Sequence, residues 1–382
     1  MTWLLILVFY NLRHSYILNE LTFDYFCLNL ILFKSKKTMT NTYKKLINLF
    51  NFFILFAFLS YNLFSQESRL FDKPFNMKLD FNMDFKDLQK NTNDTSFIKT
   101  VINYSIDGGE MLSIPTKIRA RGNFRRKICY FKPMKIKIKK KDAENTIFKG
   151  ARTLKLVLPC QNESGNNELV YKELMCYEMF EKLSKIHLKT QPVDLTIHET
   201  KGKKIIDHNV FGFLIEDDDK LADRHNAKKY PSNRRVSPLS ISDSSAVNFA
   251  IFEYMIGNTD WSMVYQHNVE MLYLNSAAFS IPYDFDHSGI VNAYYAKPNP
   301  MLNIRSVRDR IYRGMCRKDP LIFEKMRQYY VTKIDDLSSV LEKYKGKISD
   351  KEYSRINEYL GEFFEMVNSK ELFDKNISSK CR

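Results

Sequence analysis

The chain has 382 residues, 44% of them hydrophobic and 14% aromatic, and carries a formal net charge of +15. This apolar content is enough for a packed core and excludes an intrinsically disordered chain, while the length allows one large domain or two modest ones. The basic charge favours acidic partners such as nucleotides, nucleic acid, anionic lipid or acidic protein segments.

The first part of the chain has the features of a targeting segment. From Met39 the sequence has a basic start, an apolar run over 46–63 and the small residue Ser65, which is the layout of a secretory signal peptide. We therefore predict a signal peptide over 39–65 and an exported protein, located in the periplasm, the cell envelope or the medium. Residues 1–38 hold a second apolar stretch, which we interpret as an upstream extension from a start codon assigned too early. The alternative is that one apolar stretch stays uncleaved as a membrane anchor.

The cysteines behind this segment indicate a disulfide-containing body. They are Cys129, Cys160, Cys176, Cys316 and Cys381. An odd number in an oxidising compartment leaves at least one thiol free or paired with another molecule. We predict a disulfide between Cys129 and Cys160, and we expect Cys176, which lies in a helical pattern, to be buried. The spacing is too irregular for a zinc site.

From residue 66 to residue 216 the pattern is that of a β-rich half with one helix. Residues 66–95 predict an extended lead-in that adds an edge strand, and residues 97–119 predict a hairpin with its turn at Asp107 to Gly109. Residues 134–139 alternate strictly between apolar side chains and lysines, as a strand with one solvated face does. The other predicted elements of this half are a strand over 153–159, a helix over 167–186, and a β-pair over 193–199 and 210–216 with a turn over 201–209 between its strands.

The second half of the body is richer in helices. We predict a charged loop over 217–240, a helix over 246–257, strands over 269–274 and 278–285, helices over 319–345 and 351–369, and a polar tail over 371–382. A β-rich part followed by a helix-rich part, with acidic residues at the junction, is an architecture that binds a ligand in a cleft.

Two motifs at this junction carry the chemistry. Residues 257–268 read GNTDWSMVYQHN, and residues 281–289 read IPYDFDHSG. Phosphoryl transfer needs a metal that bridges phosphate oxygens, a cation on the phosphates and an acid that orients the attacking hydroxyl. Mg²⁺ prefers oxygen ligands, usually one or two carboxylates. Asp284 and Asp286 are expected on one face of a strand end because side chains repeat with period two. We therefore predict a phosphate-handling metal site.

The order of RGN at 121–123, GFLIE at 212–216, GNTDW…HN and PYDFD resembles the spore-coat CotH-type kinase family and its bacterial relatives, over about residues 97–345. The resemblance implies an α/β (α+β) class and a two-lobed atypical protein-kinase-like fold over 96–370, with a β-rich N-lobe over about 96–216 and a helix-rich C-lobe over about 217–370. It further implies binding of ATP with Mg²⁺ or Mn²⁺, and phosphorylation of Ser or Thr in a protein at the cell envelope.

The resemblance also implies roles for the matching residues. Asp260 is the catalytic-loop aspartate that orients the substrate hydroxyl and accepts its proton, and the metal ligands are Asn268, Asp284 and Asp286. The nucleotide-binding residues are Arg119, Arg121, Gly122, Asn123, Lys135, Lys137, Glu173 and Glu216. Lys137 or Lys135 binds phosphate, Glu173 is its ion-pair partner, and the stretch 213–216 is the hinge whose backbone meets adenine. The chain departs from the usual kinase pattern by a wider Asp-to-Asn spacing and by DFD in place of DFG.

Other interpretations of the same residues are open. The acids also fit turn and cap positions, and the lysines also fit the solvated face of a strand. His267 and His287 fit structural or solvent-facing positions better than metal-ligand positions. Because ATP is scarce outside the cytoplasm, the alternative function is a catalytically inactive binding or scaffold protein of the cell envelope, and a metal-dependent hydrolase is a third. Nucleic acid is a disfavoured partner because the lysines alternate as a strand requires.

Overall fold

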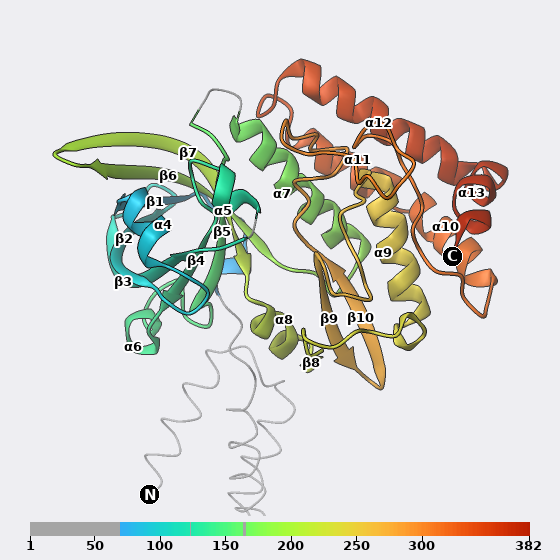
Figure 1. Cartoon of the computed structure of the whole chain (residues 1–382), viewed down its shortest axis with the longest axis horizontal. Coiled ribbons are helices and arrows are strands. Elements are labelled where there is room, and N and C mark those ends of the chain that lie inside the picture. Colours follow the sequence, from blue (N-terminus) through green and yellow to red (C-terminus); the bar gives the residue numbers. More distant parts are fainter. Residues whose placement is uncertain (1–68, 123, 163–165) are drawn as a thin grey trace, which may run out of the picture. The chain divides into compact units, whose positions relative to one another are not determined.

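The computed structural model describes residues 69–122, 124–162 and 166–382. The predicted upstream extension and signal peptide lie outside the described residues, and so does Asn123. No helix of the described part has the length and apolar character needed to span a membrane. The described residues form one compact unit. It has a mixed α/β fold, in which a closed β-barrel comes first in the chain and a helix-rich part follows (Figure 1).

The barrel has seven strands in the order β1-β2-β3-β4-β5-β7-β6. Their bounds are β1 Met77–Met83, β2 Ile98–Ile106, β3 Leu112–Ala120, β4 Met134–Ile138, β5 Thr153–Val157, β6 Thr190–Lys201 and β7 Lys204–Glu216. The apolar residues of each alternation face the interior, as Leu79, Phe81 and Ile136 do, and form the barrel core. The predicted strands over 97–119, 134–139 and 153–159 are confirmed.

The segment before residue 96 is part of the barrel wall. β1 pairs with β2 in antiparallel orientation and with β6 in parallel orientation, and these two ladders close the barrel. The helix α4 (Phe85–Asn91) follows, with Asp84 as its N-cap. The prediction of a lead-in that adds an edge strand is therefore wrong, because β1 has a partner on each side and its apolar side chains fill the core.

The hairpin of β6 and β7 is longer than predicted. The two strands pair from Thr190 opposite Ile215 to Lys201 opposite Lys204, and Gly202 makes the turn with a φ of +66°. Residues 201–207 are exposed, so they lack the apolar alternation of a half-buried strand. The predicted turn over 201–209 is wrong for this reason. Figure 1 shows the hairpin extending beyond the rest of the barrel.

A second hydrophobic core lies in the helix-rich part. Its main helices are α7 (Asn166–Leu183), α9 (Asp243–Ile256), α10 (Leu321–Val331), α11 (Ile334–Glu342), α12 (Asp350–Asn368) and α13 (Lys370–Asn376). The short elements are α5 (Phe124–Ile128), α6 (Lys140–Ala143), α8 (Asp218–Arg224), β8 (Lys228–Lys229), β9 (Val269–Leu274) and β10 (Ala277–Pro282). β8, β9 and β10 form a separate sheet in the order β10-β9-β8.

Two predictions for the end of the chain are wrong. The single helix predicted over 319–345 is two helices, α10 and α11, separated at Thr332 and Lys333. The predicted polar tail contains α13, in which Phe373 is fully buried, and a disulfide joins Cys316 to Cys381. The chain end therefore belongs to the core of the helix-rich part.

The predicted disulfide between Cys129 and Cys160 is confirmed. It joins the segment after α5 to the segment after β5. Cys176, on α7, is fully buried and is the free cysteine of the described part, as predicted.

Candidate functional site

A cavity of about 260 Å³ has walls from both parts of the fold. Val157 of β5 and Ile215 of β7 contribute the barrel side. Asp260, Asn268 and Asp284 contribute the opposite side, from loops of the helix-rich part. The structure thus brings the three predicted acid and amide residues to one cavity, although the sequence separates Asp260 from Asp284 by 24 positions.

The position of Asp260 follows from the way α9 ends. Gly257 caps the helix in the left-handed conformation, with a φ of +67°. A Cβ at this position would clash with the hydroxyl of Tyr359, so any other residue would displace that side chain. The loop that follows is held by Asn258, whose Oδ1 accepts from the backbone N–H of Asp260 at 2.9 Å and whose carbonyl accepts from Trp261 Nε1 at 3.1 Å.

Asp260 is held between two side chains of its own loop. Its Oδ1 lies 3.1 Å from His267 Nε2, and its Oδ2 accepts from Asn268 Nδ2, also at 3.1 Å. The hydrogen bond from His267 is the main reason why the pKa of Asp260 is lowered, and the same bond raises the pKa of His267. Asp260 is therefore an ionised acceptor at neutral pH. His267 and His287 both line the cavity.

We expect the Asp260–His267 ion pair to be visible in a titration. In the folded protein His267 should titrate above its ordinary pKa, and Asp260→Asn should return that pKa toward the usual range. By sign, the contribution of a raised histidine is lost as pH rises through its folded pKa, and that of a lowered aspartate is lost as pH falls through its own. The ion pair therefore stabilises the folded protein at pH values between the pKa of Asp260 and the pKa of His267. NMR of the imidazole protons measures this, with His198, which pairs with Asp80 and Asp207, as the internal control. A His267 pKa unchanged by Asp260→Asn would contradict the contact.

Asp284 and Asp286 lie beyond the strand that was expected to carry them. β10 ends at Pro282, and Asp284 has a φ of +66°. The prediction that period two places both acids on one strand face is therefore wrong, yet both line the cavity. Asn268 also has a positive φ, of +54°. Left-handed backbone costs about 1–2 kcal/mol for most residues and less for Asn and Asp, and such strain concentrates at functional sites.

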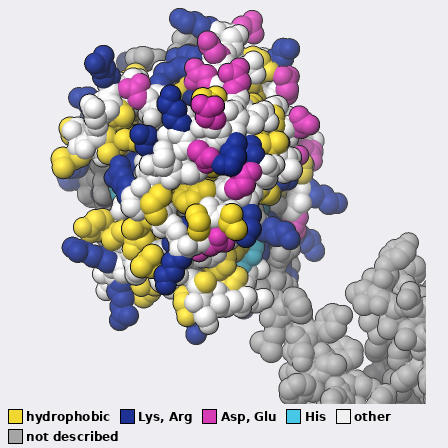
Figure 2. Space-filling model, turned by 90° about the vertical axis from the view of Figure 1, so that its right-hand side faces the viewer, with side chains coloured by type: hydrophobic (Ala, Val, Ile, Leu, Met, Phe, Trp, Pro, Cys, Tyr) yellow, Lys and Arg dark blue, Asp and Glu magenta, His cyan; other side chains and the backbone are white. Residues whose placement is uncertain are grey.

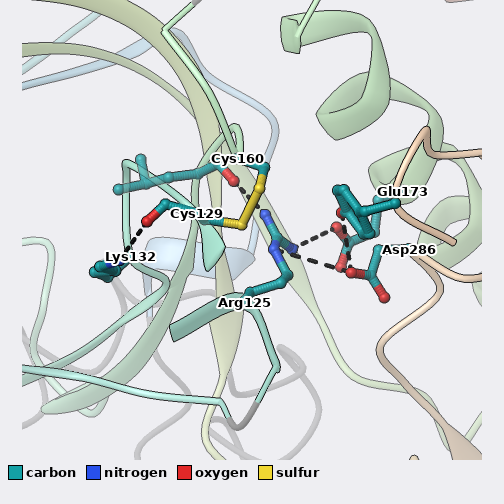
Figure 3. Close-up of a disulfide and its surroundings, with 8 residues drawn as sticks. Arg125, Cys129, Lys132, Cys160, Glu173 and Asp286 are labelled. Carbon is teal, nitrogen blue, oxygen red and sulfur yellow. Dashed lines mark hydrogen bonds and ion pairs between the residues drawn. A yellow bond between two sulfur atoms is a disulfide. The ribbon is translucent and has the colours of Figure 1, made fainter. Parts of the chain in front are cut away.

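Arg125, which also lines the cavity, has buried acidic side chains around it. Figure 3 shows its guanidinium pointing toward Glu173 and Asp286, with the disulfide of Cys129 beside it. Arg125 Nη1 lies 3.2 Å from Glu173 Oε2, and its Nε lies 3.9 Å from Asp286 Oδ2. The guanidinium also donates to the carbonyl of Leu158, next to the disulfide.

The acids of this cluster outnumber its buried cation. Burial raises the pKa of Glu173 and of Asp286, and the neighbouring carboxylates, Asp284 among them, raise both further. Arg125 opposes this shift at both residues. Tyr295 donates its hydroxyl to Asp286 Oδ2 at 3.0 Å. The pKa values of both buried carboxyl groups are therefore raised, as expected of acids that outnumber the cation beside them.

Arg125 is the functional residue that the sequence did not reveal. In RGNFRRK it stands among other cations of a basic turn, and nothing in that run distinguishes a buried arginine from exposed ones. Its side chain is 10% exposed and that of Glu173 is 3% exposed. A buried glutamate on α7 requires a cation, but the sequence assigned that cation to a lysine. The predicted lysine partner of Glu173 is therefore wrong, and Arg125 takes the place.

The two lysines predicted to bind phosphate lie away from the cavity. Lys135 Nζ pairs with Asp217 Oδ2 at 3.3 Å, and Lys137 is exposed, with its Nζ 4.8 Å from the centre of the Phe97 ring. Both side chains point outward from β4, because the inward positions belong to Met134, Ile136 and Ile138. Among the residues that the structure describes, no lysine lines the cavity.

Of the other residues predicted to contact the nucleotide, some line the cavity and others are paired elsewhere. Arg121 and Gly122 line the cavity, whereas Arg119 is directed to Asp94, at 3.4 Å. Glu216 forms an ion pair with Arg224 at 2.8 Å, and its backbone N–H donates to the backbone carbonyl of Lys189.

The predicted hinge does not fit the sheet. Residues 213–215 pair with β5 on one side and with β6 on the other. Their backbone groups are engaged in these two ladders, so they are not free to meet adenine, and this part of the prediction is wrong for the structure described.

Within the described ranges, no three His, Cys, Asp or Glu side chains are grouped so that they could hold a metal ion by themselves. No protein-family model matches the chain, and no curated protein matches it either. The functional assignment therefore depends on the geometry and charge of the cavity.

Proposed function

We propose that this cavity binds the phosphates of a nucleotide together with a divalent cation, and that Asp260 orients a protein hydroxyl for phosphoryl transfer. In this proposal the barrel and the helix-rich part correspond to the two lobes of an atypical kinase-like fold. The support is spatial: Asp260, Asn268 and Asp284 line one cavity that has barrel residues as its other wall. These are the groups that phosphoryl transfer requires.

The observation that carries the proposal is that Asp284 is unpaired among the described residues, beside acids whose pKa values are raised. Asp284 lines the cavity, and its carboxylate has no hydrogen bond or ion pair with any described residue, while the pKa values of its neighbours Asp286 and Glu173 are raised. A carboxylate in such a position is stabilised by a cation from outside the chain.

The residues present fit Mg²⁺ or Mn²⁺ bound with phosphate. Asp284 and Asp286 supply carboxylate oxygens, and Asn268 supplies its Oδ1, because its Nδ2 already donates to Asp260. Mg²⁺ in nucleotide sites usually takes one or two protein carboxylates and completes its shell with phosphate and water. When bound, the cation neutralises charge on the phosphates.

Two arginines at the cavity replace the lysine of the ordinary kinase pattern. Arg125 Nε is a buried donor without a hydrogen-bond partner among the described residues, and Arg125 and Arg121 both line the cavity. We propose that these donors face phosphate oxygens, since a guanidinium suits phosphate recognition. The cavity is smaller than the roughly 300–1,000 Å³ typical of sites for whole ligands. We therefore place the phosphates and the cation inside and the base of the nucleotide at the mouth.

The pairing of β7 with β5 and β6 favours a second function, in which the cavity binds a ligand without transferring phosphate. Because residues 213–215 are paired on both sides, the chain does not offer a kinase-type adenine contact there. This favours a binding or scaffold protein of the cell envelope that uses the cavity for a phosphorylated ligand without transferring phosphate. The two functions differ in turnover, and both require Asp284.

The test is a thermal-shift titration of the purified protein with ATP and Mg²⁺ or Mn²⁺. At 100 times its dissociation constant a ligand adds about 2.7 kcal/mol to the free energy of unfolding. We expect Asp284→Ala to abolish this shift, because the cation loses its unpaired ligand.

The matched control is Asp335→Ala, which removes an exposed carboxylate from α11. This variant should keep the full shift. A shift of wild-type size in Asp284→Ala would show that ATP binds the basic surface without using the cavity, and would overturn the proposal.

A further inference from the structure

The excess positive charge of the protein belongs almost entirely to its first half. Residues 69–216 hold 28 Lys and Arg against 18 Asp and Glu, whereas residues 217–382 hold 25 against 23. Figure 2, which views the molecule from the right-hand side of Figure 1, shows Asp and Glu side chains interspersed with Lys and Arg. A ligand that recognises positive charge is therefore expected on the barrel and not on the C-terminal helices.

On the outer wall of the barrel, three lysines form a row across three strands. Lys99 of β2 is directly opposite Lys117 of β3, and Lys117 is directly opposite Lys137 of β4. All three side chains are exposed, and none forms an ion pair with a described residue, although the neighbouring Arg119 and Lys135 both do. Like charges in directly opposite positions destabilise a sheet. Folding alone therefore does not account for the lysine row of Lys99, Lys117 and Lys137.

The lysine row is continuous with the cavity. Lys117, Arg119 and Arg121 alternate along the chain, so they project from the same side of β3 and its extension, and Arg121 lines the cavity. At about 3.3 Å per residue, the row lies about 13 Å from Arg121 along the strand. A chain bound to the row thus reaches the cavity within about four extended residues.

The chemistry around the row favours an acidic polypeptide over a nucleic acid. The aromatic side chain beside it is Phe97, and its ring is taken by two cations, Lys137 Nζ at 4.8 Å and Arg119 Cζ at 5.5 Å from its centre. A base needs a free aromatic face on which to stack. Lysine ammonium groups at the spacing of neighbouring strands suit carboxylates on flexible side chains.

We propose that the lysine row is a docking surface for an acidic segment of the protein that receives the phosphate. That this partner receives a phosphate rests on the proposed function, but its docking does not require nucleotide, cation or turnover. The acidic segment lies about four or more residues from the acceptor hydroxyl.

The test uses fluorescence anisotropy with a labelled peptide that has one serine followed, four residues later, by a tract of glutamates. A peptide with glutamines in the tract is the control ligand. We expect Lys117→Glu to weaken binding of the glutamate peptide about tenfold and to leave the weak binding of the glutamine peptide unchanged. The same variant should raise the thermal midpoint, because it places an acid between two lysines. Loss of binding together with gain of stability excludes misfolding as the cause.

Two further variants separate the outcomes. Lys351→Glu makes the same charge change at an exposed lysine of α12 and should keep affinity within about twofold. Asp284→Ala should bind the peptide as wild type does, so failure of the cavity and failure of the docking surface are distinguishable. Equal weakening by Lys117→Glu and Lys351→Glu would overturn the proposal. Tighter, Lys117-dependent binding of single-stranded DNA or of phosphatidylserine vesicles would also overturn it, in favour of nucleic acid or membrane respectively.

Discussion

Replacing Arg125 with alanine is expected to lower the free energy of unfolding by about 3–5 kcal/mol, the usual effect of removing one partner of a buried ion pair. The guanidinium is the buried cation that faces Glu173 and Asp286, and it also donates to the carbonyl of Leu158. Without it, the carboxyl groups must either take up protons or remain charged in a site of low polarity. Urea unfolding at neutral pH measures the loss.

The matched control is Arg126→Ala, one residue further along α5. Its guanidinium donates to the carbonyl of Thr92 and is only half-buried, so we expect a loss of about 1 kcal/mol. Adding Glu173→Leu to Arg125→Met should recover part of the stability, because a buried pair replaced as a whole by apolar side chains is often neutral. If Arg125→Ala were no more harmful than Arg126→Ala, the charge cluster would not be a main determinant of stability.

Replacing Asp260 with asparagine is expected to reduce phosphoryl transfer by about 100- to 10,000-fold, the usual contribution of a general base. Asparagine keeps the size of the side chain but cannot accept the proton of the hydroxyl. Asp260 is held by His267 and Asn268 and is not among the residues proposed to bind phosphate, so the thermal shift with ATP and Mg²⁺ should persist. Transfer of ³²P from labelled ATP to a serine peptide measures the rate.

Asp335→Asn serves as the control for Asp260→Asn and should transfer at the wild-type rate. Transfer by Asp260→Asn at the wild-type rate would reduce Asp260 to a structural partner of His267. Absence of transfer in the wild-type protein, with a thermal shift that depends on Asp284, would select the binding protein over the kinase.

The parts of the fold that local patterns encode were predictable. Strict alternation over 134–139 predicted β4, helical spacing predicted α7, and the expected disulfide between Cys129 and Cys160 is present. The acid and amide positions of the site were also predictable, because they occur in two short motifs at the ends of apolar runs.

The basic side of the site was not predictable, because it depends on contacts between distant parts of the chain. Whether Arg125, Lys135 or Lys137 meets Glu173 is decided by the direction in which β4 and α5 present their side chains. Alternation identifies the two faces of β4 but not which one faces the cavity. The exposed tip of the β6–β7 hairpin was not predicted for a related reason. Its residues are stabilised by backbone hydrogen bonds between the two strands and not by a core, so the sequence there lacks alternating apolar residues.

The parallel pairing of β1 with β6 decides where this protein can be cut. A chain that begins at residue 96, where the β-rich pattern becomes regular, would lose β1 and leave β2 and β6 each with an open edge. Open edges of this kind recruit strands from other molecules, so such a shortened chain should aggregate. A fragment intended for crystallisation therefore has to retain the residues from Met77 onward.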